Sequence, residues 1–165
     1  KFGYESDVVW RKELDAVLIA YKKDKYELLE TKDIKYNDLR KEFVESSKYF
    51  LHFNVGKICL LLNKETNTKL VVANTHMFWN NKDDYIKLAQ GYWLIKNISE
   101  FVNQFGLRDC PLVMCGDFNS GPQSRMHHLI NGQDYVITQE CKDFYVAHQN
   151  RKVAMDRVVD YISKN

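Results

Sequence analysis

The sequence is poor in several residue types and patterns that mark other classes of protein. Two prolines and seven glycines among 165 residues are few for an all-β fold with many tight turns. No apolar stretch near twenty residues and no signal-peptide core is visible, so we expect no membrane span in this segment and no membrane partner. The formal net charge is only +2. Because proteins that grip nucleic acid chiefly by charge are usually more basic, this charge neither supports nor excludes a nucleic acid partner.

The cysteines give no sign of a zinc site. They are Cys59, Cys110, Cys115 and Cys141, and no two of them are spaced as Cys-x-x-Cys. Cys59 and Cys115 lie inside apolar runs, which predicts small core residues. This usage fits a reducing compartment better than secretion. We therefore expect an intracellular protein, cytoplasmic or nuclear, with a mitochondrial location also open.

Length and composition predict one globular unit of the α/β class. A chain of 165 residues with 45% hydrophobic and 13% aromatic residues can bury one core. The expected strands are 14–21, 26–30, 56–62, 69–75 and 111–115, and the expected helices are 83–105 and 122–131. Segments 14–21 and 26–30 are predicted to pair as a hairpin around the turn 22–25. The charged stretch 33–49 is predicted to hold a short helix or a loop insertion.

The most informative segment is Pro111-Leu-Val-Met-Cys-Gly-Asp-Phe-Asn-Ser-Gly-Pro122. Its apolar run, 111–115, has the length of a strand buried on both faces. The turn residues that follow predict that Asp117 and Asn119 lie at the exit of this strand. Active sites are often built this way, on a loop held by a rigid element. An ordinary strand followed by an Asp/Asn turn explains the same residues.

A second apolar strand also ends in polar residues, because Lys69-Leu-Val-Val-Ala-Asn-Thr-His76 closes on an amide, a hydroxyl and an imidazole. Taken alone, His76 is more often a structural or surface histidine than a catalytic one. Together the two strand ends favour a site. Asp117 can orient a nucleophilic water, Asn119 can position a water or a phosphoryl oxygen, and a protonated His76 can stabilise an anionic transition state.

These segments, in this order, resemble a known family. The matching stretches are Asn74-Thr75-His76, Phe78-Trp79-Asn80, Ile86-Lys87-Leu88-Ala89-Gln90, Val113-Met114-Cys115-Gly116-Asp117-Phe118-Asn119-Ser120-Gly121-Pro122-Gln123-Ser124 and Leu14-Asp15-Ala16-Val17-Leu18-Ile19-Ala20-Tyr21-Lys22. The pattern resembles the endonuclease/exonuclease/phosphatase superfamily. The similar branch is that of the carbon-catabolite-repressor deadenylases, nocturnin, the 2′-phosphodiesterase and the Angel proteins. Each motif is weak alone, but their order and spacing are fairly specific. The resemblance covers about residues 2–130.

The resemblance implies a DNase-I-like fold, a four-layer α/β sandwich of two packed β-sheets flanked by helices. It also implies a divalent metal, usually Mg²⁺ with Mn²⁺ also possible, and hydrolysis of RNA, often of poly(A), from the 3′ end. By the same carry-over, Asp117 would align the attacking water, Asn119 would bind the scissile phosphate, and His76 would contact the phosphate or stabilise the developing charge. A larger assembly with protein partners is also compatible with this branch.

The sequence departs from the family pattern at two places. The family takes its principal metal ligand from an upstream Gln-Glu strand, and it uses a late Ser-Asp-His segment; neither occurs here. The stretch 155–163 resembles the family's late Asp-Tyr-Ile strand, which makes Asp160 a weak metal-ligand candidate. We therefore expect residues 1–165 to be the central part of a single domain with an incomplete fold and site. The chain is then either the middle of a longer protein or a relative that has lost these segments.

Substrate-binding residues are expected around the end of the second strand, at Asn74, Phe78, Trp79 and Asn80. The aromatic rings can stack a base, although packing of one ring against the long helix explains it equally well. Asn80 is assigned because a loop there could line the substrate cleft.

Three functions remain open from the sequence. The first, which we take as the prediction, is a magnesium-dependent 3′–5′ exoribonuclease that releases 5′-mononucleotides. The second is a catalytically inactive relative that binds RNA or supports a larger assembly. The third keeps the fold and the metal but acts on a phosphoinositide, a DNA abasic site or another phosphate ester.

Overall fold

The computed structural model describes residues 2–13, 15–42 and 52–132. The predictions for Cys141 and Asp160 lie outside these residues. The elements in chain order are β1 (Tyr4–Arg11), β2 (Asp15–Lys22), β3 (Tyr26–Lys35), the 3₁₀ turn η1 (Tyr36–Asp38), α1 (Leu39–Glu42), β4 (Val55–Asn63), β5 (Lys69–His76), the 3₁₀ turn η3 (Asn81–Asp83), α2 (Asp84–Gln104), β6 (Leu112–Asp117) and α3 (Arg125–Ile130).

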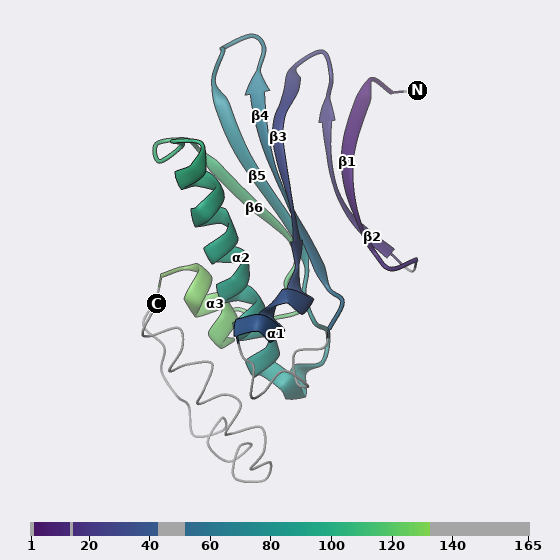
Figure 1. Cartoon of the computed structure of the whole chain (residues 1–165), viewed down its shortest axis with the longest axis vertical. Coiled ribbons are helices and arrows are strands. Elements are labelled where there is room, and N and C mark those ends of the chain that lie inside the picture. Colours follow the sequence, from purple (N-terminus) through teal and green to yellow (C-terminus); the bar gives the residue numbers. More distant parts are fainter. Residues whose placement is uncertain (1, 14, 43–51, 133–165) are drawn as a thin grey trace.

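These elements form stacked layers. Strands β1 and β2 make a two-stranded antiparallel sheet, and the second sheet has the order β3-β4-β5-β6. Within the second sheet only the pair β5–β6 is parallel. The β1–β2 sheet packs on one face of the larger sheet, over β4 and β5, and helix α2 covers the opposite face (Figure 1). Two packed sheets with helices outside were expected, and this arrangement is confirmed.

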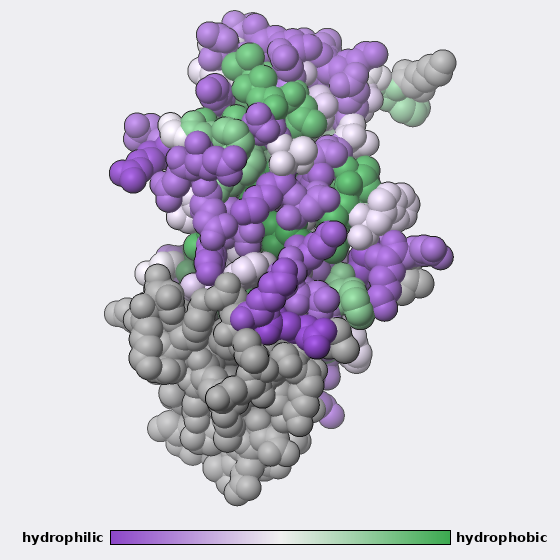
Figure 2. All heavy atoms as spheres, in the orientation of Figure 1, coloured by the Kyte–Doolittle hydropathy of each residue, from purple (hydrophilic) through white to green (hydrophobic). Residues whose placement is uncertain are grey.

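The central strand β4 shows how the sequence builds these layers. Seven consecutive residues of this strand are buried, because one side of the strand faces α2 and the other faces β1 and β2. Ile58 and Leu60 belong to the core under α2, whereas Cys59 and Leu61 pack with residues of β2. On the face shown in Figure 2, the exposed apolar side chains form separate patches among hydrophilic ones. The apolar residues are thus used mainly between the layers.

A buried charge also joins the two sheets. Lys57, on the face of β4 that β1 and β2 cover, keeps only 4% of its side chain exposed. Its ammonium lies 2.5 Å from a carboxylate oxygen of Asp7 on β1 and 2.7 Å from one of Asp33 on β3. Desolvation alone would lower the pKa of Lys57, but the hydrogen bonds to the two carboxylates outweigh it and the pKa rises. The cluster ties β1 to the larger sheet.

The predicted hairpin of 14–21 with 26–30 is wrong. Both segments are strands, but β2 pairs with β1 and β3 pairs with β4, so the turn between them carries the chain from one sheet to the other. Strand β1 was not predicted as a strand, because its apolar run, Val8-Val9-Trp10, is only three residues long and follows the polar stretch Glu5-Ser6-Asp7.

Strand β6 lies where it was expected, but its burial on both faces is wrong. Leu112 and Val113 are about half exposed, and Cys115 is exposed rather than a core residue. The reason is the position of β6 at the edge of the described sheet, where β1 and β2 pack over β4 and β5 instead. Cys59, by contrast, is buried as predicted.

The helices follow the sequence pattern more closely. Helix α2 begins at Asp84, and Gly106, with φ +63°, follows its end in the left-handed conformation that favours glycine. Helix α3 is shorter than predicted because Ser124, not Pro122, caps its start, accepting a hydrogen bond from the His127 amide at 3.2 Å. Within the described part of the chain, no helix has the length and apolar character that a membrane crossing requires.

Candidate active site at the carboxyl ends of β5 and β6

The two polar strand ends meet where β5 and β6 stop, at one end of the larger sheet. We call this end, with His76, Asp117 and Asn119, the edge. In the parallel β5–β6 ladder His76 is paired with Asp117, and Thr75 with Gly116. Parallel neighbours direct paired side chains to the same face, so the imidazole and the carboxylate lie side by side at the strand exits. The sequence placed both residues at strand ends, and the fold brings the ends together.

Gly116 makes this close approach possible. Its φ is +130°, a backbone conformation that residues with a side chain rarely adopt. A Cβ atom there would lie 2.7 Å from the Thr75 nitrogen and 2.8 Å from the Asn74 side-chain oxygen, and closer still to the Thr75 carbonyl oxygen. Since these distances are shorter than real Cβ contacts, only glycine fits between β6 and β5 at this position.

Asn119 fixes the loop after β6. Its amide nitrogen donates to Asp117 Oδ1 at 2.8 Å, and its φ of +49° is the left-handed conformation that asparagine tolerates. Its side-chain nitrogen donates to the Met77 carbonyl at 3.0 Å, while the Met77 amide donates to the Asp117 carbonyl at 2.9 Å. The loops after β5 and β6 are therefore bonded to each other.

This bonding leaves two oxygens at the edge. In residues 2–13, 15–42 and 52–132, no hydrogen bond is made to Asp117 Oδ2 or to the side-chain oxygen of Asn119. Asp117 is exposed. A carboxylate oxygen and an amide oxygen, held by a rigid loop, are thus available to a water or a substrate.

Two buried side chains of α2 hold these loops from behind. Lys87 donates from Nζ to the Asn119 carbonyl at 2.9 Å. Desolvation lowers the pKa of Lys87, while the nearby charges of Asp84 and Asp83 act in the opposite direction. This lysine therefore supports the loop that carries Asp117.

Gln90 supports the other loop. Its side-chain oxygen accepts from the Phe78 amide at 2.8 Å, and its side-chain nitrogen donates to the Asn54 side-chain oxygen at 3.4 Å. Asn54 in turn donates to the His76 carbonyl at 3.0 Å. Lys87 and Gln90 were noticed only as part of a family-like motif. Their spacing of three residues on one helix face explains why the motif can serve both loops.

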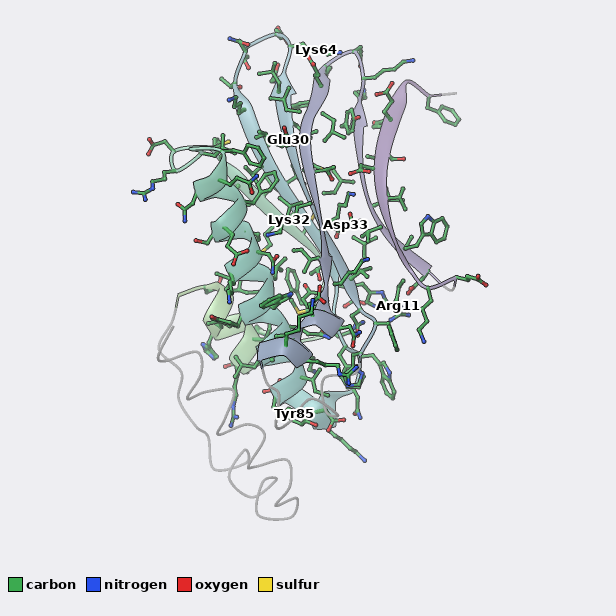
Figure 3. The ribbon with its side chains drawn as sticks, viewed as in Figure 1. Arg11, Glu30, Lys32, Asp33, Lys64 and Tyr85 are labelled. Carbon is green, nitrogen blue, oxygen red and sulfur yellow. The ribbon has the colours of Figure 1, made fainter. Side chains whose placement is uncertain are left out.

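His76 contacts a carboxylate, that of Asp15, which was not among the residues expected at the site. Its Nδ1 lies 3.5 Å from Asp15 Oδ2, and Arg11 Nε donates to Asp15 Oδ1 at 2.6 Å. Arg11 and Asp15 are cross-strand partners at the end of the β1–β2 sheet, and Figure 3 shows Arg11 at that end. In the sequence Asp15 is only a charged residue at the start of an apolar strand, and this pattern gives no information about its contact with His76, 61 positions later.

The expected substrate-binding residues have different surroundings. Trp79 is 70% exposed, whereas the half-buried Phe78 ring lies 4.1 Å from the His52 ring, centroid to centroid. Asn80 caps η3, accepting from the Lys82 amide at 3.0 Å. Asn74 donates to the Leu18 carbonyl of β2 at 2.8 Å. The substrate-binding role of these residues stays a prediction, for which Trp79 offers the most open surface.

The residues at the edge do not build a metal centre by themselves. No group of three or more His, Cys, Asp and Glu side chains suited to a metal ion occurs within the described ranges. Asp117 and Asn119 offer hard oxygen donors of the kind that Mg²⁺ prefers, but two donors are an incomplete set.

Comparison with known proteins identifies relatives of the chain. No protein-family model matches it. It is 33% identical over 133 residues to protein angel homolog 2 of Bos taurus, an alignment covering 78% of this chain and 23% of that protein. It is 32% identical over 148 residues to 2′,5′-phosphodiesterase 12 of Homo sapiens, covering 79% and 24%. It is 27% identical over 150 residues to the CCR4-Not complex 3′–5′-exoribonuclease subunit Ccr4 of Mycosarcoma maydis, covering 74% and 22%.

A solved structure is similar to this chain in both fold and sequence. The crystal structure of ANGEL2, described as a 2′,3′-cyclic phosphatase in complex with adenosine-2′,3′-vanadate, superimposes with a TM-score of 0.67 at 32% identity. The match covers 79% of this chain and 36% of that chain. The expected fold class is confirmed. The chain spans less than a quarter of the length of the curated relatives that it matches.

Proposed function

The chain belongs to the endonuclease/exonuclease/phosphatase superfamily, in the branch of the Angel and Ccr4 proteins, and on that premise we propose that the whole protein is a 3′–5′ exoribonuclease. Its substrate is the 3′ end of RNA, with poly(A) as the first candidate, and its products are 5′-mononucleotides. The relatives are named as a 2′,5′-phosphodiesterase, a 3′–5′-exoribonuclease subunit and a 2′,3′-cyclic phosphatase. They support the reaction class more strongly than the exact substrate.

The observation that carries the proposal is the grouping of His76, Asp117 and Asn119 at the ends of β5 and β6, on loops that are hydrogen-bonded to each other. Hydrolysis forms a bond between a water oxygen and phosphorus and breaks the bond from phosphorus to the 3′ oxygen of the preceding nucleotide. Asp117 Oδ2 accepts a hydrogen bond from the attacking water and orients it. The 3′ oxygen leaves as a hydroxyl after taking up a proton.

Phosphate recognition falls to the other two residues of the edge. The side chain of Asn119 binds the scissile phosphate, with its second amide hydrogen as the donor. His76 lies beside Asp117 and stabilises the charge that develops on the phosphoryl oxygens. Because both strand-exit loops are bonded to each other and to α2, these groups are held in place before the substrate arrives.

A divalent metal, Mg²⁺ with Mn²⁺ as the alternative, belongs to the proposal through the family alone. When bound, such an ion neutralises phosphate charge and lowers the pKa of a coordinated water. The donor set at the described edge does not fit a complete metal site, so no step above depends on the ion. Further partners in a larger assembly are proposed by analogy with the complex named for Ccr4.

The proposal is tested on the intact protein with a 5′-labelled RNA that ends in twenty adenosines. The expected result is a ladder that shortens from the 3′ end, with 5′-AMP as the released product, in Mg²⁺ or Mn²⁺ and not in EDTA. RNA that is bound but never cut with either metal would contradict the proposal and favour the inactive relative. Removal of a terminal cyclic phosphate without chain shortening would contradict the exonuclease assignment in a different way.

A further inference from the structure

We propose that Lys12 and Phe53 form a subsite for single-stranded RNA, in which the ring stacks on a base and the ammonium binds a phosphate on the 5′ side of the bond that is cut. The inference rests on the proposed function, because it takes RNA as the substrate. Lys12 belongs to the turn between β1 and β2, and Phe53 to the segment before β4. Neither residue was expected at the site.

The two side chains lie against each other although 41 positions separate them in the chain. The Nζ atom of Lys12 is 3.6 Å from the centroid of the Phe53 ring. Lys12 follows Arg11 in the turn that leads to Asp15, the cross-strand partner of Arg11, and its φ of +54° is uncommon for a lysine. Figure 3 shows Arg11 at this end of the molecule. The turn therefore brings a cation over an aromatic ring.

Both members of the pair are open to a ligand. Lys12 is exposed, and Phe53 is 42% exposed. Among the residues that the structure describes, Lys12 makes no ion pair. An exposed cation–π contact is weaker than the stacking of a base on an aromatic side chain. A base can therefore displace the ammonium from the ring, and the displaced ammonium then meets the negative charge of an adjacent phosphate.

The pair lies beside the edge. Val55, the first residue of β4, is the ladder partner of His76, so Phe53 lies just beyond the end of the sheet at which β5 stops. The strand order β4-β5-β6 puts Phe53 and Asp117 on opposite sides of His76. Neighbouring strands are about 4.8 Å apart, which places the ends of β4 and β6 about 10 Å from each other. The pair is therefore placed for the strand next to the scissile phosphate rather than for that phosphate.

Neighbouring rings connect the pair with the loop after β5. The His52 ring lies 4.1 Å from the Phe78 ring, and the Phe78 ring lies 6.2 Å from the Trp79 ring, centroid to centroid. Because His52 precedes Phe53 in the chain, aromatic groups lead from Trp79 to Phe53. Aromatic side chains with cations beside them bind successive nucleotides of a single strand without selecting the base. An enzyme that shortens RNA from the 3′ end must hold such a strand on the 5′ side of the cut.

The first test measures binding without cleavage. A 5′-fluorescein-labelled RNA of ten adenosines is titrated with the intact protein in EDTA, and fluorescence anisotropy gives Kd at about 50–300 mM KCl. One phosphate contact in a single strand adds about 0.7 to the slope of log K against log salt, and we expect Lys12→Gln to lose this amount. Lys69→Gln, which removes an exposed lysine at the opposite end of β5, is the matched control and should keep the wild-type slope. An unchanged slope in Lys12→Gln would overturn the proposal.

The second test separates stacking from a merely structural role of the ring. We expect Phe53→Ala to raise Kd for the ten adenosines by about 5–100-fold, the range for one stacked base. On an oligomer of the same length with abasic nucleotides upstream of its 3′ end, the same change should raise Kd by less than about twofold, because no base is left to stack. Phe2→Ala removes an exposed ring at the far end of the β1–β2 sheet and should bind both oligomers as the wild type does. Equal losses of affinity on both oligomers would overturn the proposal.

The remaining outcomes are also decisive. Should Phe53→Ala fail to fold, Phe53→Leu keeps an apolar side chain without an aromatic face, and wild-type affinity in this variant would overturn the proposal. A wild type that binds neither oligomer would overturn it as well. Should the wild type cut no RNA while the binding results hold, the exonuclease assignment fails and the subsite stands. Should it cut RNA while Lys12→Gln and Phe53→Ala bind as the wild type does, the subsite fails and the proposed function stands.

Discussion

Replacing Gly116 by alanine tests whether the edge depends on the close approach of β6 to β5. The φ of +130° is a conformation that only glycine adopts readily, and the new Cβ atom would lie 2.7 Å from the Thr75 nitrogen. Both neighbours of the new atom on Thr75 are backbone groups, which cannot rotate away. The strands must therefore separate or the local backbone must change.

The size of the effect can be worked from these contacts. A side chain held at such a φ costs about 1–3 kcal/mol. Separating the strand ends also weakens the hydrogen bond from the Met77 amide to the Asp117 carbonyl, 2.9 Å long, at about 1 kcal/mol. We expect Gly116→Ala to lower the free energy of unfolding by about 3 kcal/mol, a large part of the usual 5–15 kcal/mol.

Urea unfolding of the intact protein, followed by circular dichroism, measures this loss. With slopes of about 1–3 kcal/mol per molar urea, the midpoint should fall by about 1 M or more. Gly121→Ala in the same loop is the matched control, because its Cβ atom would meet nothing within 4 Å and its φ is not positive. We expect this control to change stability by less than about 1 kcal/mol. Equal stability of the two variants would show that the backbone at position 116 accommodates a Cβ atom without loss.

Three further predictions concern the buried charges. Lys57→Met should destabilise the protein by about 2–3 kcal/mol in urea unfolding at pH 7, because Asp7 and Asp33 lose the cation between them; a variant as stable as the wild type would contradict this. Desolvation raises the pKa of Asp7, but the hydrogen bond to Lys57 acts against it and the pKa falls below 3.8. The folded state therefore binds fewer protons than the unfolded state as the pH approaches this range. The stability advantage of the wild type over Asp7→Asn should then be present above pH 3.8 and shrink as the pH falls further. Lys87→Met removes the hydrogen bond to the Asn119 carbonyl and should lower kcat on RNA about 100-fold, while stability falls by less than about 3 kcal/mol; unchanged kcat would show that the loop needs no support from α2.

Much of the fold could be predicted from short apolar runs and their boundaries. The strands at 56–62, 69–75 and 111–115 and the long helix are confirmed within a few residues, because each is a strong local pattern ended by turn residues. The partner of a strand is not a local property. The turn 22–25 joins two sheets rather than one hairpin, and nothing in its residues distinguishes the two cases.

The candidate site divides in the same way. His76 and Asp117 could be placed at strand ends from the sequence, and the parallel pairing of β5 with β6 brings them together. Asp15 could not be connected to His76, since the two are brought together by the stacking of one sheet on the other. The supporting roles of Lys87 and Gln90 likewise depend on which loops the helix happens to cover.

The rate of RNA cleavage by Asp117→Ala in the intact protein with Mg²⁺ decides whether the ends of β5 and β6 form the active site. We expect a loss of at least about 100-fold in kcat. The free energy of unfolding should fall by only about 1 kcal/mol, because Asp117 is exposed and the change removes the single hydrogen bond from the Asn119 amide to Asp117 Oδ1. Asp109→Ala, which removes another exposed carboxylate from the loop before β6, should cleave at the wild-type rate. Full turnover by Asp117→Ala would contradict the assignment of this edge as the active site.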